Sequence, residues 1–174
     1  MVRWPSMAGA RAVLLRTVGL YVLLVVALLL ALRTSVVGDW FLRPFNTMAA
    51  VAAAAALGWL GVPAARVGTQ ILGPGGLSVV IVTQCTGLDA VILLLPAIVV
   101  FPSSWRAKAL GVGLGLGVMA GLNLVRIVSL CYVGTYSAAA LQVGHIYVWP
   151  VVVIVAALLT LLVWVERIAV PLHR

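Results

Sequence analysis

Long apolar runs, separated by short polar segments, make up most of this 174-residue chain. About 20 apolar residues suffice to cross the ~30 Å hydrocarbon core of a bilayer as a helix. The runs predict membrane helices at residues 17–32 (extended by part of 13–16), 86–101, 109–133 and 145–165. Residues 45–61 are rich in alanine, the best helix former, and predict a fifth helix whose pattern leaves open whether it spans. The expected fold is an all-α polytopic membrane protein with four to five membrane helices.

Residues 63–83 have a different pattern. Residues 66–72 partly alternate between polar and apolar, residues 73–76 read Gly-Pro-Gly-Gly, and residues 77–82 are rich in β-branched side chains. This order predicts a short β-hairpin directly before the helix at 86–101. Because open strand edges are not tolerated in lipid, we expect the hairpin on the outer membrane surface.

The composition supports a membrane protein and argues against a nucleic-acid binder. Hydrophobic residues make up 65% of the chain and charged residues only 8%, against about 25% in a soluble domain. No polar stretch is long enough for a second domain, so residues 1–174 are interpreted as one integral membrane domain. The net charge of +8 comes from basic residues scattered singly at the ends of apolar runs, which is typical of membrane orientation and of contact with anionic lipid.

Basic residues also predict the orientation of the helices. The loop at 102–108 is basic, and residues 1–16 contain three arginines and no acid, so both are expected in the cytoplasm. The helix at 86–101 then enters from the outer face, and the helix at 145–165 starts there. We expect a multi-pass protein of the inner (cytoplasmic) membrane. The alanine-rich helix then does not fully span, which we favour; if it does span, the amino terminus lies outside.

Three side chains are candidates for one site at the outer face: Cys85, Arg126 and His145. A thiolate is the reactive form of cysteine, and a helix start or a nearby cation favours it. Arg126 is the only charge of its helix after Lys108, and an ion inside a membrane segment indicates function. Histidine titrates near neutral pH and suits a general base. The alternatives are a buried structural cysteine, an ion pair between Arg126 and Asp89, and a capping or interface histidine.

Other residues are secondary candidates. Asn123 lies three residues before Arg126 on the same helix face and could support the site or join two helices, and Thr86 and Asp89 flank the start of the cysteine-bearing helix. Gly113, Gly117 and Gly121 recur every four residues, which predicts close helix packing. The two cysteines form no Cys-x-x-Cys pair and no Cys/His cluster, so we expect no redox cofactor or metal.

At these positions the chain resembles the exosortase/archaeosortase family of membrane cysteine transpeptidases. The resemblance lies in Cys85-Thr-Gly-Leu-Asp-Ala, in Asn123-Leu-Val-Arg-Ile, in His145-Ile-Tyr-Val-Trp and in the loop Phe101-Pro-x-x-Trp-Arg-Ala-Lys. It covers roughly residues 60–165, with nothing carried over to residues 1–60. The short length and the Cys-x-Gly-Leu-x-Ala form resemble most the exosortase H branch.

The resemblance implies a mechanism. A substrate would be an exported protein with a carboxy-terminal sorting tail: a short motif, a transmembrane helix and a basic end. Cys85 would attack a peptide carbonyl and form a thioester, with His145 as acid–base and Arg126 as stabiliser of the oxyanion or the thiolate. The competing interpretation is a non-catalytic membrane subunit, such as a transporter part or an assembly scaffold.

Overall fold

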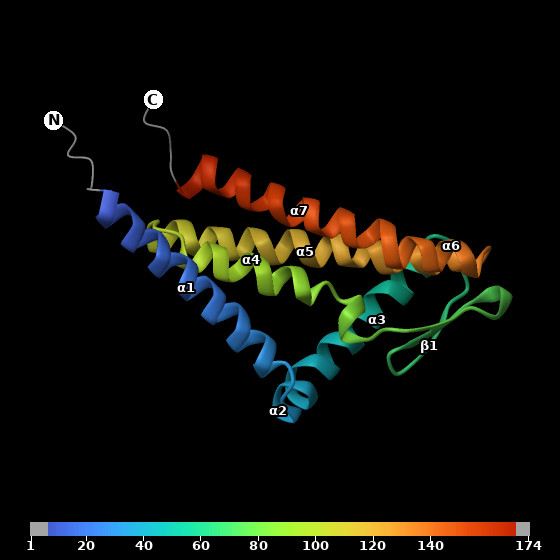
Figure 1. Cartoon of the computed structure of the whole chain (residues 1–174). Helices are drawn as coiled ribbons and strands as arrows, with labels where there is room; N and C mark the ends of the chain where they lie inside the picture. Colours follow the sequence, from blue (N-terminus) through green and yellow to red (C-terminus); the bar gives the residue numbers. More distant parts are fainter. Residues whose placement is uncertain (1–6, 170–174) are drawn as a thin grey trace.

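The computed structural model describes residues 7–169, which form a helical bundle with one small sheet (Figure 1). Helix α1 (Met7–Ala31) leads through α2 (Ser35–Val37) and a π-helical turn, η1 (Gly38–Leu42), into α3 (Arg43–Trp59). The sheet follows, with β1 (Ala65–Val67), β2 (Gln70–Leu72) and β3 (Ser78–Val80). Then come α4 (Leu88–Val100), α5 (Trp105–Gly134), α6 (Ala138–Val143), the π-helical η4 (Gly144–Val148), α7 (Trp149–Trp164) and η5 (Val165–Ala169).

Three helical segments of the described chain are long and apolar enough to cross a membrane: Val13–Ala31, Trp105–Gly134 and Ala138–Ala169. The apolar helix α4 is shorter, and α3 belongs to neither group. The predicted helical membrane protein is therefore confirmed.

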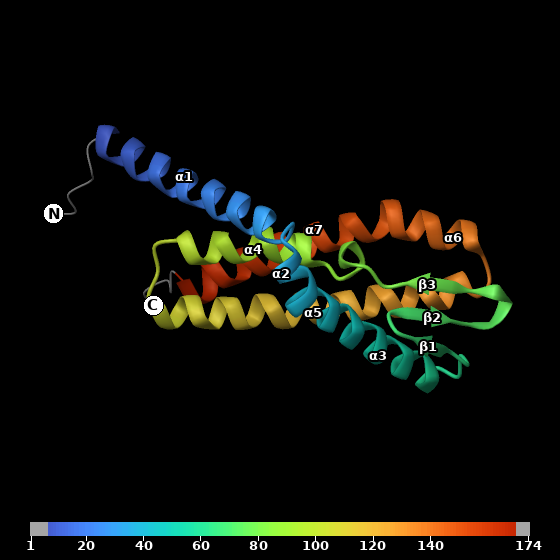
Figure 2. The ribbon, with the colours of Figure 1, turned by 90° about the horizontal axis from the view of Figure 1, so that it is seen from below.

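The bundle has two different ends. Helices α4, α5 and α7 run side by side, and the start of α1, the α4–α5 loop and the end of η5 lie at one end, here called the loop end (Figures 1 and 2). The sheet, α6 and the end of α3 lie at the opposite end, the sheet end. Since α1 starts at the loop end and α3 finishes at the sheet end, α3 runs beside the sheet-end half of the bundle rather than recrossing it.

The sheet has three antiparallel strands in the order β1-β2-β3. The predicted hairpin is present as β2–β3, joined by a turn in which Gly75 has a φ of 70°. The sequence analysis missed β1, which pairs with β2 through a two-residue turn that begins at Gly68, with a φ of 60°. Glycine occupies both turns because a positive φ costs it no steric strain.

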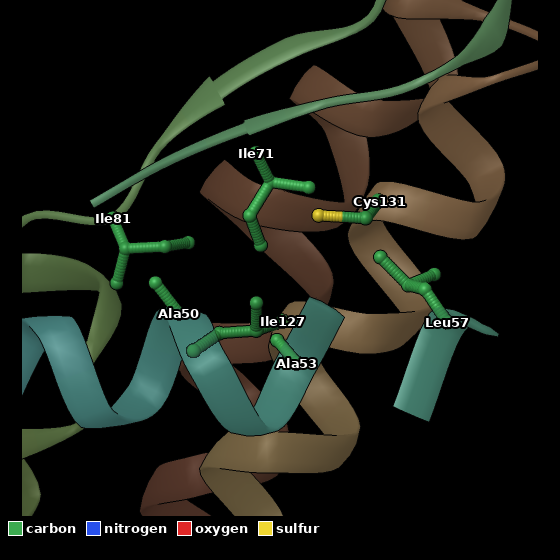
Figure 3. Close-up of a cluster of buried hydrophobic side chains, with 7 residues drawn as sticks. All are labelled: Ala50, Ala53, Leu57, Ile71, Ile81, Ile127 and Cys131. Atoms are coloured by element: carbon green, nitrogen blue, oxygen red, sulfur yellow. The ribbon is translucent and has the colours of Figure 1, made fainter. Parts of the chain in front are cut away.

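Of the three clusters of buried side chains in the described residues, two stabilise the contacts of α5. At the sheet end, α3, the sheet and α5 contribute to one cluster, made up of Ala50, Ala53, Leu57, Ile71, Ile81, Ile127 and Cys131 (Figure 3). The other cluster joins α4, α5 and α7 around the fully buried Trp164. The small side chains of the alanine-rich run therefore let α3 lie close to α5.

Two expectations about helices are wrong. Gly113, Gly117 and Gly121 face open space, and the packed glycines are Gly111 and Gly115, on another face of α5. The last helix begins at Ala138 rather than at residue 145. Ser137 caps it, because its hydroxyl accepts a hydrogen bond from the Ala140 N–H at 3.2 Å.

Candidate active site

Cys85 lies in a short turn between the sheet and α4. It is the last residue of the 3₁₀ turn η3 (Thr83–Cys85), and its N–H donates to the Val82 carbonyl at 2.8 Å. The buried Thr86 closes the same turn by donating its hydroxyl to the Thr83 carbonyl at 2.6 Å. Gly87 follows with a φ of 68°, and only then does α4 begin, at Leu88 rather than at residue 86. The half-buried thiol is thus held by a rigid turn just before the helix.

Arg126 lies on α5 with only 7% of its surface exposed, so its charge is almost entirely enclosed by protein. Its Nη2 lies 3.4 Å from Nδ1 of His145. Asp89 is exposed and forms no ion pair with Arg126, so the structural pair considered from the sequence is absent. The guanidinium has no carboxylate partner among residues 7–169 and faces an imidazole instead.

The contact with Arg126 defines the protonation of His145. A guanidinium has only donors, so the Nδ1 atom facing it is an acceptor and carries no proton. We therefore assign the neutral tautomer with its proton on Nε2.

The backbone around His145 explains how the ring reaches Arg126. His145 lies in the π-helical turn η4, inside a continuous helix and not at its start as expected. A Cβ added at Gly144 would lie 3.0 Å from the Leu130 side chain of α5, so glycine allows η4 to approach α5 closely. A π-helical turn inside an α-helix often marks a functional position.

One cavity of about 640 Å³ joins the three candidate residues. Cys85, Arg126 and His145 all line it, together with residues 75–82 at the edge of the sheet and residues 134–138 at the junction of α5 and α6. The structure thus brings together the three side chains that the sequence analysis singled out.

The supporting candidates lie outside the lining of this cavity. Asn123 is buried, its Oδ1 has no partner within residues 7–169, and a Cβ added at Gly87 would lie 3.4 Å from that oxygen. It therefore packs against the turn that holds Cys85. Thr86 closes that turn, and Asp89 points to the exterior.

The sequence analysis missed Asn46. Its Nδ2 lies 3.4 Å from the Thr83 hydroxyl and links α3 to the cysteine turn. An amide at the start of an otherwise alanine-rich helix was the signal that could have identified it. No group of three or more His, Cys, Asp or Glu side chains within the described residues could hold a metal ion.

The length of α5 accounts for a buried arginine in a membrane protein. The helix has 30 residues, about 45 Å at 1.5 Å per residue, which exceeds the ~30 Å hydrocarbon core. If the exposed Trp105 lies at one membrane border, Arg126 lies about 32 Å further along, at the other border. With that placement the site would lie at an interface, where an ion is far less costly than at the centre of the bilayer.

The apolar spans define a membrane protein, and at one end of its bundle a thiol, a guanidinium and an imidazole line one cavity. The family model described as transmembrane exosortase (Exosortase_EpsH) matches residues 2–167. The chain therefore belongs to the transmembrane exosortase family, whose members are generally cysteine transpeptidases. The match also extends the resemblance to residues 2–60, where the sequence analysis had carried nothing over. It does not distinguish branches, so the exosortase H branch stays a prediction.

Searches of curated proteins and of solved structures found no match to this chain.

Proposed function

We propose that this protein is a cysteine transpeptidase of the inner membrane that cleaves carboxy-terminal sorting tails of exported proteins at the outer face. The observation that carries the proposal is the shared cavity of Cys85, Arg126 and His145 at the sheet end. Arg11 and Arg16 belong to the first half of α1, and Arg106 and Lys108 belong to the first turn of α5; both helices start at the loop end, which by the positive-inside rule belongs in the cytoplasm. The sheet end then faces outward, where an exported protein would present its tail.

The first step is attack by sulfur on a peptide carbonyl. The thiol proton passes to Nδ1 of His145, the Cys85 Sγ–carbon bond forms, and the carbonyl oxygen becomes an oxyanion. In the free enzyme, however, Nδ1 faces Arg126 and is not available to the thiol.

Substrate binding resolves this competition. When a carbonyl oxygen enters the cavity, the guanidinium moves from His145 to that oxygen, where negative charge develops in the transition state. The move releases Nδ1 as a base at the moment when the oxyanion needs a donor. Arg126 thus keeps His145 from acting as a base until a substrate is bound.

The second step breaks the peptide bond. The imidazolium of His145 donates a proton to the leaving amine, the carbon–nitrogen bond breaks, and a thioester on Cys85 remains. A nucleophile at the outer face attacks the thioester and releases the thiol. The amine half carries the tail helix away in the membrane. The residues named here complete this cycle with no redox change.

The chain contains its own control for the test. Cys131 is fully buried in the cluster of Figure 3 and does not line the cavity. The reporter is an exported protein fused to a carboxy-terminal tail with a motif, an apolar helix and a basic end, and the tail is taken from a protein whose gene lies near the gene of this protein. Cys85→Ala should abolish processing of this reporter. Cys131→Ala, with equal membrane levels, should keep most of the activity. Mass spectrometry of wild-type protein should detect an acyl adduct on Cys85.

Continued processing by the Cys85→Ala variant would show that Cys85 is not the nucleophile. If neither cysteine substitution changed processing, and a substitution of Arg126 disrupted a complex with a partner, a non-catalytic membrane subunit would be favoured instead.

A further inference from the structure

We propose that the free edge of β3 binds the substrate segment that precedes the scissile bond, as a fourth strand running parallel to β3. The inference rests on the proposed function and assigns its substrate site. It names main-chain groups, not side chains, as the main contact.

The hydrogen bonds of the sheet identify which groups of β3 are free. The Gly73 N–H donates to the Leu77 carbonyl and the Ile81 N–H donates to the Thr69 carbonyl, each at 2.9 Å. Hydrogen-bonded pairs alternate along an antiparallel ladder, so residues 77, 79 and 81 bond to β2. The N–H and C=O groups of Ser78 and Val80 therefore point away from the sheet.

This free edge borders the cavity of the active site. Residues 75–82 line the cavity, and Cys85 follows three residues after this segment. The strand is held firmly, because Val79 and Ile81 pack toward the buried cluster while Val80 is 51% exposed. Its register cannot slip by one residue without exposing Ile81. An edge strand that ends beside a nucleophile is a rigid guide for an extended peptide.

The opposite wall of the cavity comes from α5, α6 and η4, and includes Leu141, Gln142 and His145. A substrate strand bound between this wall and β3 would form main-chain hydrogen bonds with β3. Every second side chain of that strand would lie in the cavity. The same arrangement would place the carbonyl that follows it beside Cys85 and within reach of Arg126.

The direction of the chain favours parallel pairing. From the sheet end toward the loop end, β3, η3 and α4 follow one another along the bundle (Figure 2). A substrate with its folded part outside and its tail helix in the membrane runs the same way. Parallel pairing then uses both the N–H and the C=O of Val80, which bond to two substrate residues on either side of the facing one.

Proline substitution tests the main-chain contact. Val80→Pro removes an N–H that faces the cavity and leaves the ladder to β2 intact, and free strand edges accept proline. Processing of the tailed reporter should fall about fivefold to tenfold, as expected for lost hydrogen bonds. Val80→Ala removes the same side chain but keeps the N–H, so it is the reference against which the activity of Val80→Pro is compared.

The opposite edge of the same sheet supplies a matched control. Arg66 pairs with Ile71, whose groups bond to β3, so the Arg66 N–H points away from the sheet on the β1 side. Arg66→Pro and Arg66→Ala should process the reporter equally. Equal activity of Val80→Pro and Val80→Ala in folded protein would overturn the proposal.

Photocross-linking gives a readout that does not depend on folding of a proline variant. A photoreactive residue at Val80 in the Cys85→Ala protein should cross-link the reporter, while the same residue at Val67, which is 65% exposed on β1, should not. Cross-linking to a second copy of this chain, or equal yields at both positions, would contradict the proposal.

The outcomes separate the two proposals. A reporter that wild-type membranes do not process, or process without Cys85, refutes the proposed function. Processing that needs Cys85 but tolerates Val80→Pro, without cross-links at Val80, refutes only the strand pairing.

Discussion

The two ends of helix α5 are built in opposite ways. Toward the loop end, Gly111 and Gly115 face neighbouring helices, and the fully buried Trp164 donates its Nε1–H to the Ala107 carbonyl at 2.8 Å. Toward the sheet end, Asn123 Oδ1 and Arg126 Nε are buried without a hydrogen-bond partner among the described residues. In the loop-end half of the helix the buried indole is hydrogen-bonded. The sheet-end half packs against α3 and the sheet through Ile127 and Cys131, and it also lines the cavity and contains buried polar atoms without a partner.

The difference shows where stability and chemistry reside. A buried polar atom without a partner costs about 1–3 kcal/mol, so such atoms persist only where something compensates for them. Of the four such atoms in the described residues, Asn123 Oδ1 and Arg126 Nε lie within one turn of this helix, next to the cavity that Cys85 and His145 line, whereas Asn46 Oδ1 lies on α3 and Ser103 Oγ lies in the α4–α5 loop.

Arg126→Lys should have the largest effect on processing, because it changes only the sheet-end half of α5, which lines the cavity. Lysine keeps the positive charge but loses the planar set of donors that can move from His145 to an oxyanion. Loss of one such donor costs about 10²–10³-fold in rate, so reporter processing should fall by that factor. The thermal unfolding of the purified protein in detergent should change little by comparison. Near-normal processing would mean that Arg126 only balances charge.

Gly111→Ala addresses the loop-end half. The added methyl group would overlap the indole of Trp164, whose position is held by its hydrogen bond to Ala107. Overpacking of this kind costs about 1–3 kcal/mol, which should lower the thermal unfolding midpoint. At low temperature the folded fraction should still process the reporter at nearly the normal rate.

The control for Gly111→Ala is Gly117→Ala on the same helix, where an added Cβ meets nothing within 4 Å. It should leave the midpoint unchanged or raise it slightly, because alanine favours helix more than glycine. Equal midpoints for the two variants would contradict the packing described here.

The sequence predicted the parts of this molecule that depend on local pattern. Apolar length identified the spans, and the rarity of a charge in an apolar run singled out Arg126. The turn residues and β-branched run at 73–82 predicted the hairpin. These signals are short-range and need no knowledge of neighbouring helices.

The parts that were wrong depend on tertiary contacts. Gly113 and Gly117 carry the same local signal as Gly111, and the positions of Trp164 and Leu94 on neighbouring helices decide which face is packed. The start of the last helix was misplaced because Ser137 was taken as loop, although its hydroxyl caps the helix. The role of β3 as a wall of the cavity follows from the approach of α6 and η4, which no local pattern encodes.

The smallest expected effect concerns Asn46, which ties α3 to the cysteine turn beside the sheet-end half of α5. Asn46→Ala removes a long hydrogen bond to Thr83 and also a buried Oδ1 that has no partner in the described part of the chain. These losses offset each other, so stability should change little while processing falls roughly threefold through a looser Cys85 turn. Thr47→Val, which removes a hydroxyl that bonds only to the Arg43 carbonyl of its own helix, should leave processing unchanged.

Because Asn46 and Thr83 act through one contact, the effects of Asn46→Ala and Thr83→Ala on processing should not be additive when the two substitutions are combined. Full additivity in that double-mutant cycle would show that Asn46 acts through something other than the cysteine turn.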